Sequence, residues 1–358
     1  MDLLDLDMLQ KLSEADGIAG CEAQVSQLVR SYFENYTESI DYDDLGSIIG
    51  LQRGHESDFR IMLAGHMDEV GFLVREIDGQ GYVKLIPVGS WWGHVMPCQI
   101  MRITTDQGQK IEGIIGSRAP HGMDQLEKEK VIPPLEHFLD LGVASKEEVM
   151  ALGVQIGDMV TPATAFAPMN SPQYLRGKAW DDRIGVAVVI EVLKRLQHRP
   201  HAASIYGVGT VQEEVGLRGA RTAGYKVKPH IALAIDVTTA QDTPLEKGEL
   251  GLGKGAVLSL LDATALGNQK LIDQFRAIAE ELQIAFHYDC MTVGGTDTGN
   301  LHKIQEGVLA MSLSIPVRYM HSPQLVIHQQ DVLDTIELIT TFCEKMDKKT
   351  YLEWIGGF

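Results

Sequence analysis

The chain has 358 residues, a formal net charge of −18, and ordinary shares of hydrophobic (44%) and charged (22%) residues. This composition is typical of a globular protein with one large domain or two moderate ones. The negative charge argues against binding to nucleic acid, which needs a basic face, and against adsorption to anionic lipid. No apolar run approaches the roughly 18 residues of a membrane span. We therefore expect neither a nucleic-acid partner nor a membrane partner.

The four cysteines lie far apart in the sequence and form no Cys-x-x-Cys pair. This spacing favours reduced thiols over a disulfide framework or a zinc–thiolate site. The first residues include Asp2 and Asp5, where a signal peptide would carry lysines. We therefore predict a cytoplasmic location.

The first 70 residues predict two amphipathic helices followed by two strands. Their apolar patterns cover residues 4–14, 22–35, 45–53 and 59–65. The last run is bounded by glycine and ends in His66, Asp68 and Glu69. Such a run predicts a buried strand of a parallel sheet, and chemistry in these sheets gathers beyond the carboxyl ends of the strands. A lone histidine at a strand end is as often structural, so a site here needs support from other segments.

From about residue 71 the pattern changes to short strands separated by glycine turns. Two hairpins and one further strand are predicted, over residues 72–77 with 82–87, 100–105 with 110–115, and 154–160. Only residues 145–152 look helical in this region. Short strands with little helix predict a small β-barrel-like domain. We predict that it is an insert over residues 71–165, and that residues 1–70 and 166–358 form one catalytic α/β domain.

After residue 172, helices and strands alternate again. Helices are predicted over residues 183–197, 220–225, 269–282 and 331–346, and strands over residues 204–211, 231–235 and 308–315. Alternation of this kind is typical of sheets covered by helices on both faces. The predicted fold class is therefore α/β, with a mixed, largely parallel sheet flanked by helices and the inserted β domain.

Polar residues follow four of the buried-type strands, and a pair of acids precedes a helix. These residues are His66, Glu213–Glu214, Asp236, His321 and Asp181–Asp182. If the strands are parallel, their ends converge along one edge of the sheet. Histidine and carboxylate ligands suit Zn²⁺, Co²⁺ or Mn²⁺, and a carboxylate can bridge two ions about 3.5–4 Å apart.

A hydrolytic metal site also needs one carboxylate that is free to take a proton from the attacking water. Adjacent extended side chains point to opposite sides of the chain. The Glu213–Glu214 pair can therefore supply one metal ligand and one base.

Each of these residues also has a simpler interpretation. The Asp181–Asp182 pair can cap a helix, the Glu213–Glu214 pair can be a solvated loop, and His321 can belong to a turn. Asp236 is the hardest to explain in this way, because an acid that closes an apolar strand is costly unless it is bound. Their joint placement is far less expected by chance than any single residue.

Five segments, in order along the chain, resemble the signatures of the M42 family of metallo-aminopeptidases. That family includes glutamyl aminopeptidases and the tetrahedral TET peptidases. The segments are Gly65–Gly71, Gly177–Arg183, Gln212–Ala220, Gly294–Asp297 and Arg318–Pro323. The resemblance covers almost the whole chain and includes an inserted β domain.

Carried over residue by residue, the resemblance implies two divalent metal ions per subunit, most readily Zn²⁺ or Co²⁺, with Mn²⁺ as another option. Asp181 would bridge the two ions. His66 and Asp236 would complete the protein ligands of one ion, and Glu214 and His321 those of the other.

The resemblance also implies roles in the hydrolysis of an amino-terminal peptide bond. The metals would polarise the carbonyl and activate a bridging water, Glu213 would accept its proton, and Asp68 would orient His66. Trp180 departs from the smaller apolar residue expected before the bridging aspartate, which bears on pocket shape and not on the ligand set. Homo-oligomers are implied as well: dimers built by the inserted domain and, in some members, dodecamers.

Two other functional classes are weighed against a peptidase. An endoglucanase-type glycoside hydrolase needs two free carboxylates and no metal, which leaves the strand-end histidines unexplained, and aromatic residues are only 6% of the chain. A non-catalytic member of the fold would not need Glu213 beside a complete ligand set. The preferred amino-terminal residue stays open, because Arg318 can either pair an acidic substrate side chain or brace the loop that carries His321.

Overall fold

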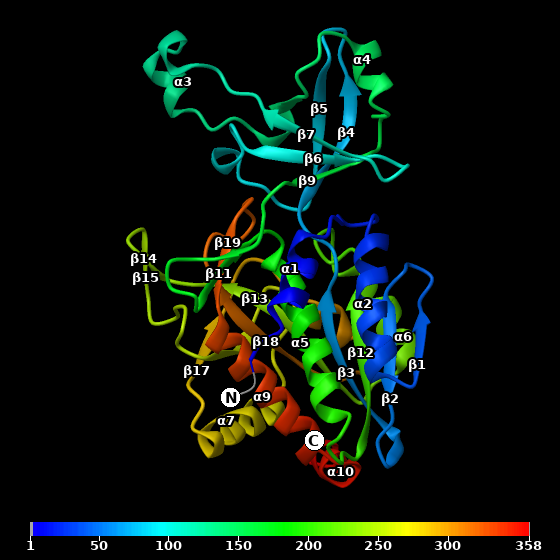
Figure 1. The fold of residues 1–358 in the computed structure, drawn as a ribbon. Helices are drawn as coiled ribbons and strands as arrows, with labels where there is room; N and C mark the ends of the chain where they lie inside the picture. Colours follow the sequence, from blue (N-terminus) through cyan, green and yellow to red (C-terminus); the bar gives the residue numbers. More distant parts are fainter. Residues whose placement is uncertain (1–2, 358) are drawn as a thin grey trace.

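The computed structural model describes residues 3–357. It consists of a larger α/β domain and a closed β barrel that projects from one end of it (Figure 1). The prediction of a mixed, largely parallel sheet with an inserted β-barrel-like domain is confirmed.

An eight-stranded sheet forms the centre of the α/β domain. In spatial order its strands are β1 (Ser39–Tyr42), β2 (Ile48–Gln52), β12 (Ala203–Thr210), β3 (Glu56–His66), β13 (Ile231–Thr239), β18 (Leu309–Val317), β16 (Ala256–Leu261) and β17 (Phe286–Cys290). The four central strands, β12, β3, β13 and β18, are parallel to one another. Antiparallel pairs occur only toward the edges of this sheet, among residues 3–357.

Helices cover both faces of the sheet, which explains why its central strands are apolar on both sides. One face packs against α1 (Leu6–Glu14), α2 (Ala23–Tyr36), α5 (Trp180–Leu196), α7 (Gln269–Leu282) and α9 (Gln329–Lys345). The other face packs against α6 (Arg218–Val227) and α8 (Thr298–Leu301). Strand β3 shows the alternation directly: Ile61 and Leu63 belong to the first core cluster, and Met62 and Ala64 belong to the second.

The remaining elements of the α/β domain are short. They are β10 (Ala167–Pro168), β11 (Tyr174–Gly177), β14 (Asp242–Thr243), β15 (Glu246–Lys247), β19 (Leu325–His328) and the closing helix α10 (Lys348–Ile355). Within residues 3–357 the structure contains no helix that is long and apolar enough to span a membrane.

The barrel closes in the order β4-β5-β8-β7-β6-β9 around its own apolar core. Its strands are β4 (Gly71–Ile77), β5 (Tyr82–Val88), β6 (Ile100–Thr104), β7 (Lys110–Ile115), β8 (Phe138–Asp140) and β9 (Met159–Pro162). Two short helices accompany them, α3 (Gln125–Glu129) and α4 (Lys146–Ala151).

The structure corrects two details of the sequence prediction for the barrel. The strand predicted over residues 154–160 begins only at Met159, because Gly157 has a φ of 96° and the chain turns there. Residues 145–152 are not the only helical segment, since α3 forms on an arm that reaches away from the barrel (Figure 1). Helix α3 has no buried residue, so it carries no apolar periodicity by which the sequence could reveal it.

Asp16 joins the two parts of the molecule. It follows α1, its side chain is fully buried, and it accepts a hydrogen bond from the Thr161 hydroxyl of β9 at 2.8 Å. The ammonium groups of Lys110 and Lys178 lie 2.7 and 3.1 Å from its carboxylate. Burial alone would raise the pKa of Asp16, but Lys178 and Lys110 lower it well below its ordinary value. Arg102 of β6 lies 3.4 Å from the same carboxylate, so one side chain ties the α/β domain to three barrel strands.

We predict that Asp16→Asn lowers the free energy of unfolding by roughly 3 kcal/mol at neutral pH, because removal of one partner leaves buried charge uncompensated. Urea denaturation of both proteins measures this difference. A depressed pKa means that the contribution of Asp16 is complete above its unfolded-state pKa of about 4. The difference should therefore shrink as the pH falls below that value.

Glu112→Gln is the matched control. Glu112 contacts Arg102, which also reaches Asp16, but the Glu112 side chain is 54% exposed. Its loss should cost less than about 1 kcal/mol. An Asp16→Asn protein as stable as the wild type at neutral pH would contradict the proposed role of Asp16 in connecting the two domains.

Candidate functional site

The carboxyl ends of the four central strands bring five of the predicted residues to one edge of the sheet. His66 is the last residue of β3, and Asp236 lies near the end of β13. Glu213 and Glu214 follow β12, and His321 follows β18. The start of α5 adds Asp181. All six of these residues line one cavity of about 480 Å³.

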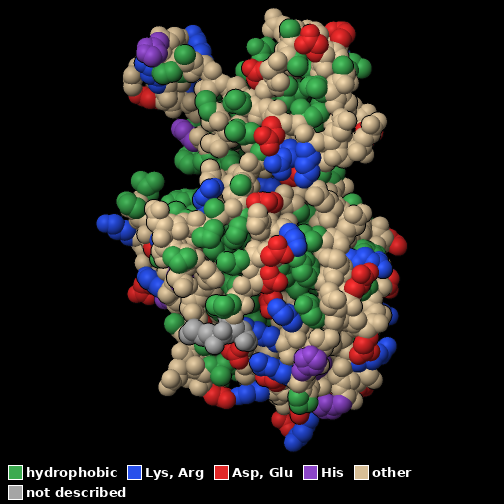
Figure 2. Space-filling model, viewed as in Figure 1, with side chains coloured by type: hydrophobic (Ala, Val, Ile, Leu, Met, Phe, Trp, Pro, Cys, Tyr) green, Lys and Arg blue, Asp and Glu red, His purple; other side chains and the backbone are tan. Residues whose placement is uncertain are grey.

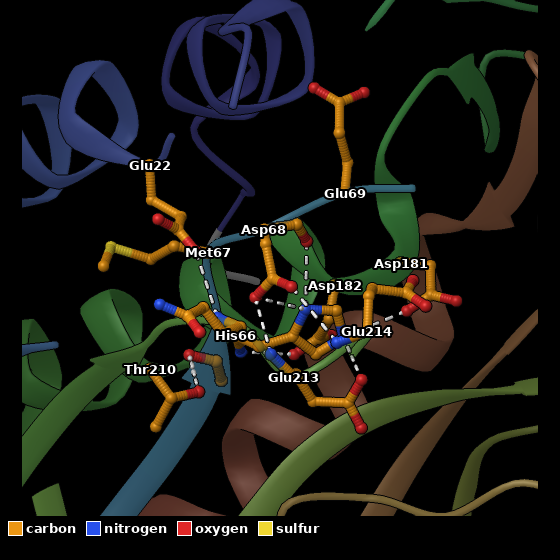
Figure 3. Close-up of polar contacts among 12 residues, drawn as sticks. Glu22, His66, Met67, Asp68, Glu69, Asp181, Asp182, Thr210, Glu213 and Glu214 are labelled. Carbon is orange, nitrogen blue, oxygen red and sulfur yellow. Dashed lines mark hydrogen bonds and ion pairs between the residues drawn. The ribbon is translucent and has the colours of Figure 1, made fainter. Parts of the chain in front are cut away.

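Asp181 lies between the two histidines. Its Oδ1 is 3.2 Å from Nε2 of His66, and its Oδ2 is 3.3 Å from Nε2 of His321. Glu214 Oε1 lies 3.6 Å from the same His321 nitrogen, and Glu213 Oε2 lies 4.0 Å from His66 Nε2. Figure 3 shows these carboxylates gathered on one side of His66.

Two overlapping groups have donor atoms close enough to share one ion each. The first is His66, Glu213 and Asp236, and the second is His66, Asp181 and Glu214, with all donor atoms of a group within 4.8 Å of one another. Nitrogen and carboxylate oxygen donors in this arrangement suit Zn²⁺, Co²⁺ or Mn²⁺.

The cluster holds more negative than positive charge in a buried space. Burial raises the pKa of Asp236 and of Glu214 to about 8, and in both cases the nearby Asp181 carboxylate adds to the effect. Burial alone would lower the pKa of His66, but the charge of Glu213 and the hydrogen bonds of Asp181 and Asp68 raise it well above its ordinary value. Only a further positive charge would let all of these carboxylates ionise together.

Two features of the side chains fit a metal ion. Glu214 Oε1 is buried and has no hydrogen-bond partner among the described residues. Nδ1 of His66 lies 3.0 Å from the carbonyl oxygen of Asp68, so an Nδ1–H donated there leaves the Nε2 lone pair facing the carboxylates. The residues present therefore fit metal binding.

Asp68 also positions the loop that follows β12. Its Oδ1 accepts a hydrogen bond from the backbone N–H of Glu213 at 3.0 Å, and its Oδ2 accepts one from the N–H of Glu214 at 3.1 Å. The nearest Asp68 carboxylate oxygen is 3.7 Å from His66 Nδ1. The close contact of Asp68 with His66 is thus made by its carbonyl, and its carboxylate holds the two glutamates.

The Asp181–Asp182 pair has two separate functions. Asp182 Oδ1 accepts a hydrogen bond from the N–H of Gly185 at 3.0 Å, so Asp182 caps the first turn of α5. Its Oδ2 accepts the backbone N–H of His66, also at 3.0 Å. The capping interpretation therefore applies to Asp182, and Asp181 faces the histidines.

Glu69 is a structural neighbour of the cluster. It is buried, points away from the carboxylates in Figure 3, and lies 2.5 Å from Lys178 Nζ and 3.3 Å from Arg183 Nη2. This buried ion pair supports the segment on which His66 and Asp68 lie.

Sequence reasoning did not assign a role to Asp297, which lies beneath the cluster. It is buried and accepts a hydrogen bond from the Thr210 hydroxyl at 2.5 Å. Burial raises the pKa of Glu213 and Asp236, and the negative charge of Asp297 adds to this effect. The sequence feature that could have indicated a role is the position of Asp297 directly after two glycines and a threonine, in one of the five segments that resemble the family.

The structure defines the surroundings of Trp180 and Arg318, whose roles the sequence left open. Trp180 is fully buried, packs edge-on against Phe166, and does not line the cavity. Arg318 is held by Asp242 through two hydrogen bonds of 2.7 and 2.6 Å and lies over the Tyr174 ring. Its charge is therefore already paired, which favours the bracing role.

The family model for M42 glutamyl aminopeptidases matches residues 46–338. The chain belongs to this family. It is 32% identical to the lysyl aminopeptidase of Pyrococcus furiosus over 355 residues, which cover 96% of this chain and 98% of that protein. It is 29% identical to the glutamyl aminopeptidase of Lactococcus lactis subsp. cremoris, with 91% and 92% covered. The predicted M42 membership is confirmed, and the chain is an aminopeptidase, a hydrolase of peptide bonds.

Solved structures agree with this family. A TET aminopeptidase from Thaumarchaeota archaeon SCGC AB-539-E09 has a TM-score of 0.94 at 34% identity, with 98% of both chains covered. The TET1 peptidase of Pyrococcus horikoshii, which can assemble into a tetrahedron or a large octahedral shell, has a TM-score of 0.85 at 28% identity, with 95% and 99% covered. A Thermotoga maritima protein described as an endoglucanase has a TM-score of 0.78 at 28% identity, with 97% and 99% covered.

We predict that Asp68→Asn lowers both the affinity for Zn²⁺ and kcat/KM by about 10- to 100-fold. An amide has one acceptor oxygen, so its NH₂ group would face the backbone N–H of Glu213 or Glu214. Competition with a chromophoric chelator measures the affinity, and hydrolysis of an amino-acid p-nitroanilide measures the rate. Asp78→Asn, in the turn between β4 and β5, is the control. Unchanged affinity and rate in Asp68→Asn would show that the Asp68 carboxylate does not position the residues of the cluster.

Proposed function

We propose that the protein is a two-metal aminopeptidase that removes amino-terminal residues from peptides. The observation that supports this most strongly is the pair of overlapping donor groups that share His66. The cluster is rich in carboxylates, so it suits divalent cations and also the positive charge of a peptide α-ammonium group.

The proposed ligands are those that the family resemblance implies, and the contacts of Asp181 with both histidines and of Glu214 with His321 support them. Asp181 would bridge the two ions, since its two oxygens face His66 and His321 separately. His66 and Asp236 would complete the protein ligands of one ion, and Glu214 and His321 those of the other. Zn²⁺ and Co²⁺ are the preferred ions, and Mn²⁺ is also compatible with these donors.

Glu213 is the proposed general base. Bound metal ions would polarise the scissile carbonyl and make a water molecule acidic enough to attack it. Glu213 takes a proton from that water as the new C–O bond forms, and it gives the proton to the departing amine nitrogen as the C–N bond breaks. Asp68 keeps Glu213 in place through the backbone N–H of that residue.

The assembly is proposed to be a homo-oligomer in which the inserted domain, residues 71–165, forms dimers; a dodecamer is the larger alternative. Ten of the 21 large apolar side chains that are exposed within residues 3–357 belong to this insert, which is about a quarter of the chain. Ile100 and Ile114 are two of them and pair across β6 and β7. Light scattering after gel filtration measures the mass, and a monomer at micromolar concentration would contradict the proposed homo-oligomer. A cytoplasmic location stays a prediction.

The glycoside hydrolase alternative is tested by metal removal. We expect EDTA to abolish hydrolysis of amino-acid p-nitroanilides and added Co²⁺ or Zn²⁺ to restore it, because each central carboxylate lies with a histidine in one donor group or ion pair. A non-catalytic protein would hydrolyse nothing before or after metal addition. Cellulose hydrolysis that survives EDTA would favour the alternative and contradict the peptidase.

We predict that Glu213→Gln keeps both metal ions but lowers kcat by about 10²- to 10⁴-fold, the usual contribution of a general base. The amide keeps the size of the side chain and cannot accept a proton. Metal analysis and steady-state kinetics on the same sample separate the two effects. Glu34→Gln on α2, where Glu34 is exposed and pairs with Arg30, is the control. A Glu213→Gln rate near that of the wild type would exclude Glu213 as the base.

A further inference from the structure

Within residues 3–357, the cavity beside the cluster is lined by no charged side chain other than the six of the cluster itself. Its apolar lining residues are Leu217, Val237, Ala263, Met291, Val293 and Met320. We propose that this cavity receives an uncharged, apolar amino-terminal side chain, so that the enzyme prefers residues such as leucine or methionine over glutamate and lysine. This inference rests on the proposed aminopeptidase function and names its substrate class.

Among the described residues that line the cavity, no lysine or arginine is present to pair an acidic amino-terminal side chain. Arg318 lines a neighbouring cavity of about 790 Å³ that shares Thr239, Met320 and His321 with the first. This second cavity lies between β14–β15 and Trp92, on the side where Figure 2 shows a notch between the barrel and the α/β domain. Both oxygens of Asp242 already bind the Arg318 guanidinium. The charge of a substrate glutamate would therefore have no partner in the cavity, which is unfavourable.

Outside the cluster, the described lining of the cavity contains no acid that could pair a basic side chain. The acid behind this wall is Asp262, which is 4% exposed. Its Oδ1 accepts hydrogen bonds from the backbone and hydroxyl of Thr264, and its Oδ2 accepts one from the Thr296 hydroxyl at 3.0 Å. These threonines line the cavity, but their hydroxyl groups are bound to Asp262. The wall therefore offers neither a free charge nor a free hydroxyl at these positions.

The loop that closes the cavity is suited to apolar side chains of different lengths. A Cβ added at Gly295 would lie 2.5 Å from Thr264 Cγ2, so the loop packs tightly against the wall at this point. Met291 is flexible and polarizable, which lets it adapt to unbranched and branched partners. Val293 is 84% exposed, so it lies at the mouth, where a new side chain can be introduced without disturbing the core.

The test uses the full-length wild type with Co²⁺ and four p-nitroanilides, those of leucine, methionine, glutamate and lysine. We expect kcat/KM for the leucine and methionine substrates to exceed the values for glutamate and lysine by at least about 10-fold. Val293→Arg should raise the ratio of glutamate to leucine hydrolysis several-fold, because it adds a cation at the mouth. Thr292→Arg adds the same charge on an exposed neighbour outside the lining and should leave the ratio unchanged.

These measurements distinguish a failure of the apolar preference from a failure of the aminopeptidase function. Faster hydrolysis of the glutamate or lysine substrate than of leucine would overturn the apolar preference and leave the aminopeptidase function intact. Equal shifts in Val293→Arg and Thr292→Arg would overturn the assignment of this cavity to the amino-terminal side chain. Hydrolysis of none of the four substrates would overturn the proposed function and the preference with it.

Discussion

The central constraint on this structure is the electrostatic cost of packing carboxylates together out of water. Asp181, Glu213, Glu214 and Asp236 face one cavity with only two histidines among them. Burial and mutual repulsion raise the pKa of three of these acids, and Asp181 is the exception because both histidines lie against it. A fold rarely keeps such a cluster unless cations bind there.

Much of the structure serves to hold this cluster in place. Four adjacent parallel strands end at one edge, and α5 begins there and carries Asp181 in its first turn. Asp68 uses its carbonyl for His66 and its carboxylate for the loop that carries both glutamates. Beneath these residues, Glu69 is paired with Lys178, and Lys178 also contacts Asp16, which reaches the barrel. The segment that carries His66 and Asp68 is therefore supported by the same buried ion pairs that connect to the inserted domain.

Sequence patterns predicted best the features that depend on a single strand or helix. The apolar runs predicted β3, β12, β13 and β18 and so the edge at which the polar residues meet, and the predicted helix over residues 269–282 coincides with α7. Contacts between distant segments could not be predicted in this way. The carboxylate of Asp68 binds the backbone of Glu213 and Glu214, which lie 145 and 146 positions further along the chain. Arg318 pairs with Asp242 across 76 positions. Short strands such as β8 have too few residues to show a period.

Metal analysis of the purified protein and of Asp181→Asn tests the central claim most directly. After equilibration with Zn²⁺ or Co²⁺ and removal of free metal, the wild type should retain two ions per chain. Asp181→Asn should lose both together, because its side chain faces both histidines and would no longer carry the bridging charge. A wild type that retains fewer than two ions, or an Asp181→Asn protein that still binds two tightly, would contradict a bridged two-metal centre.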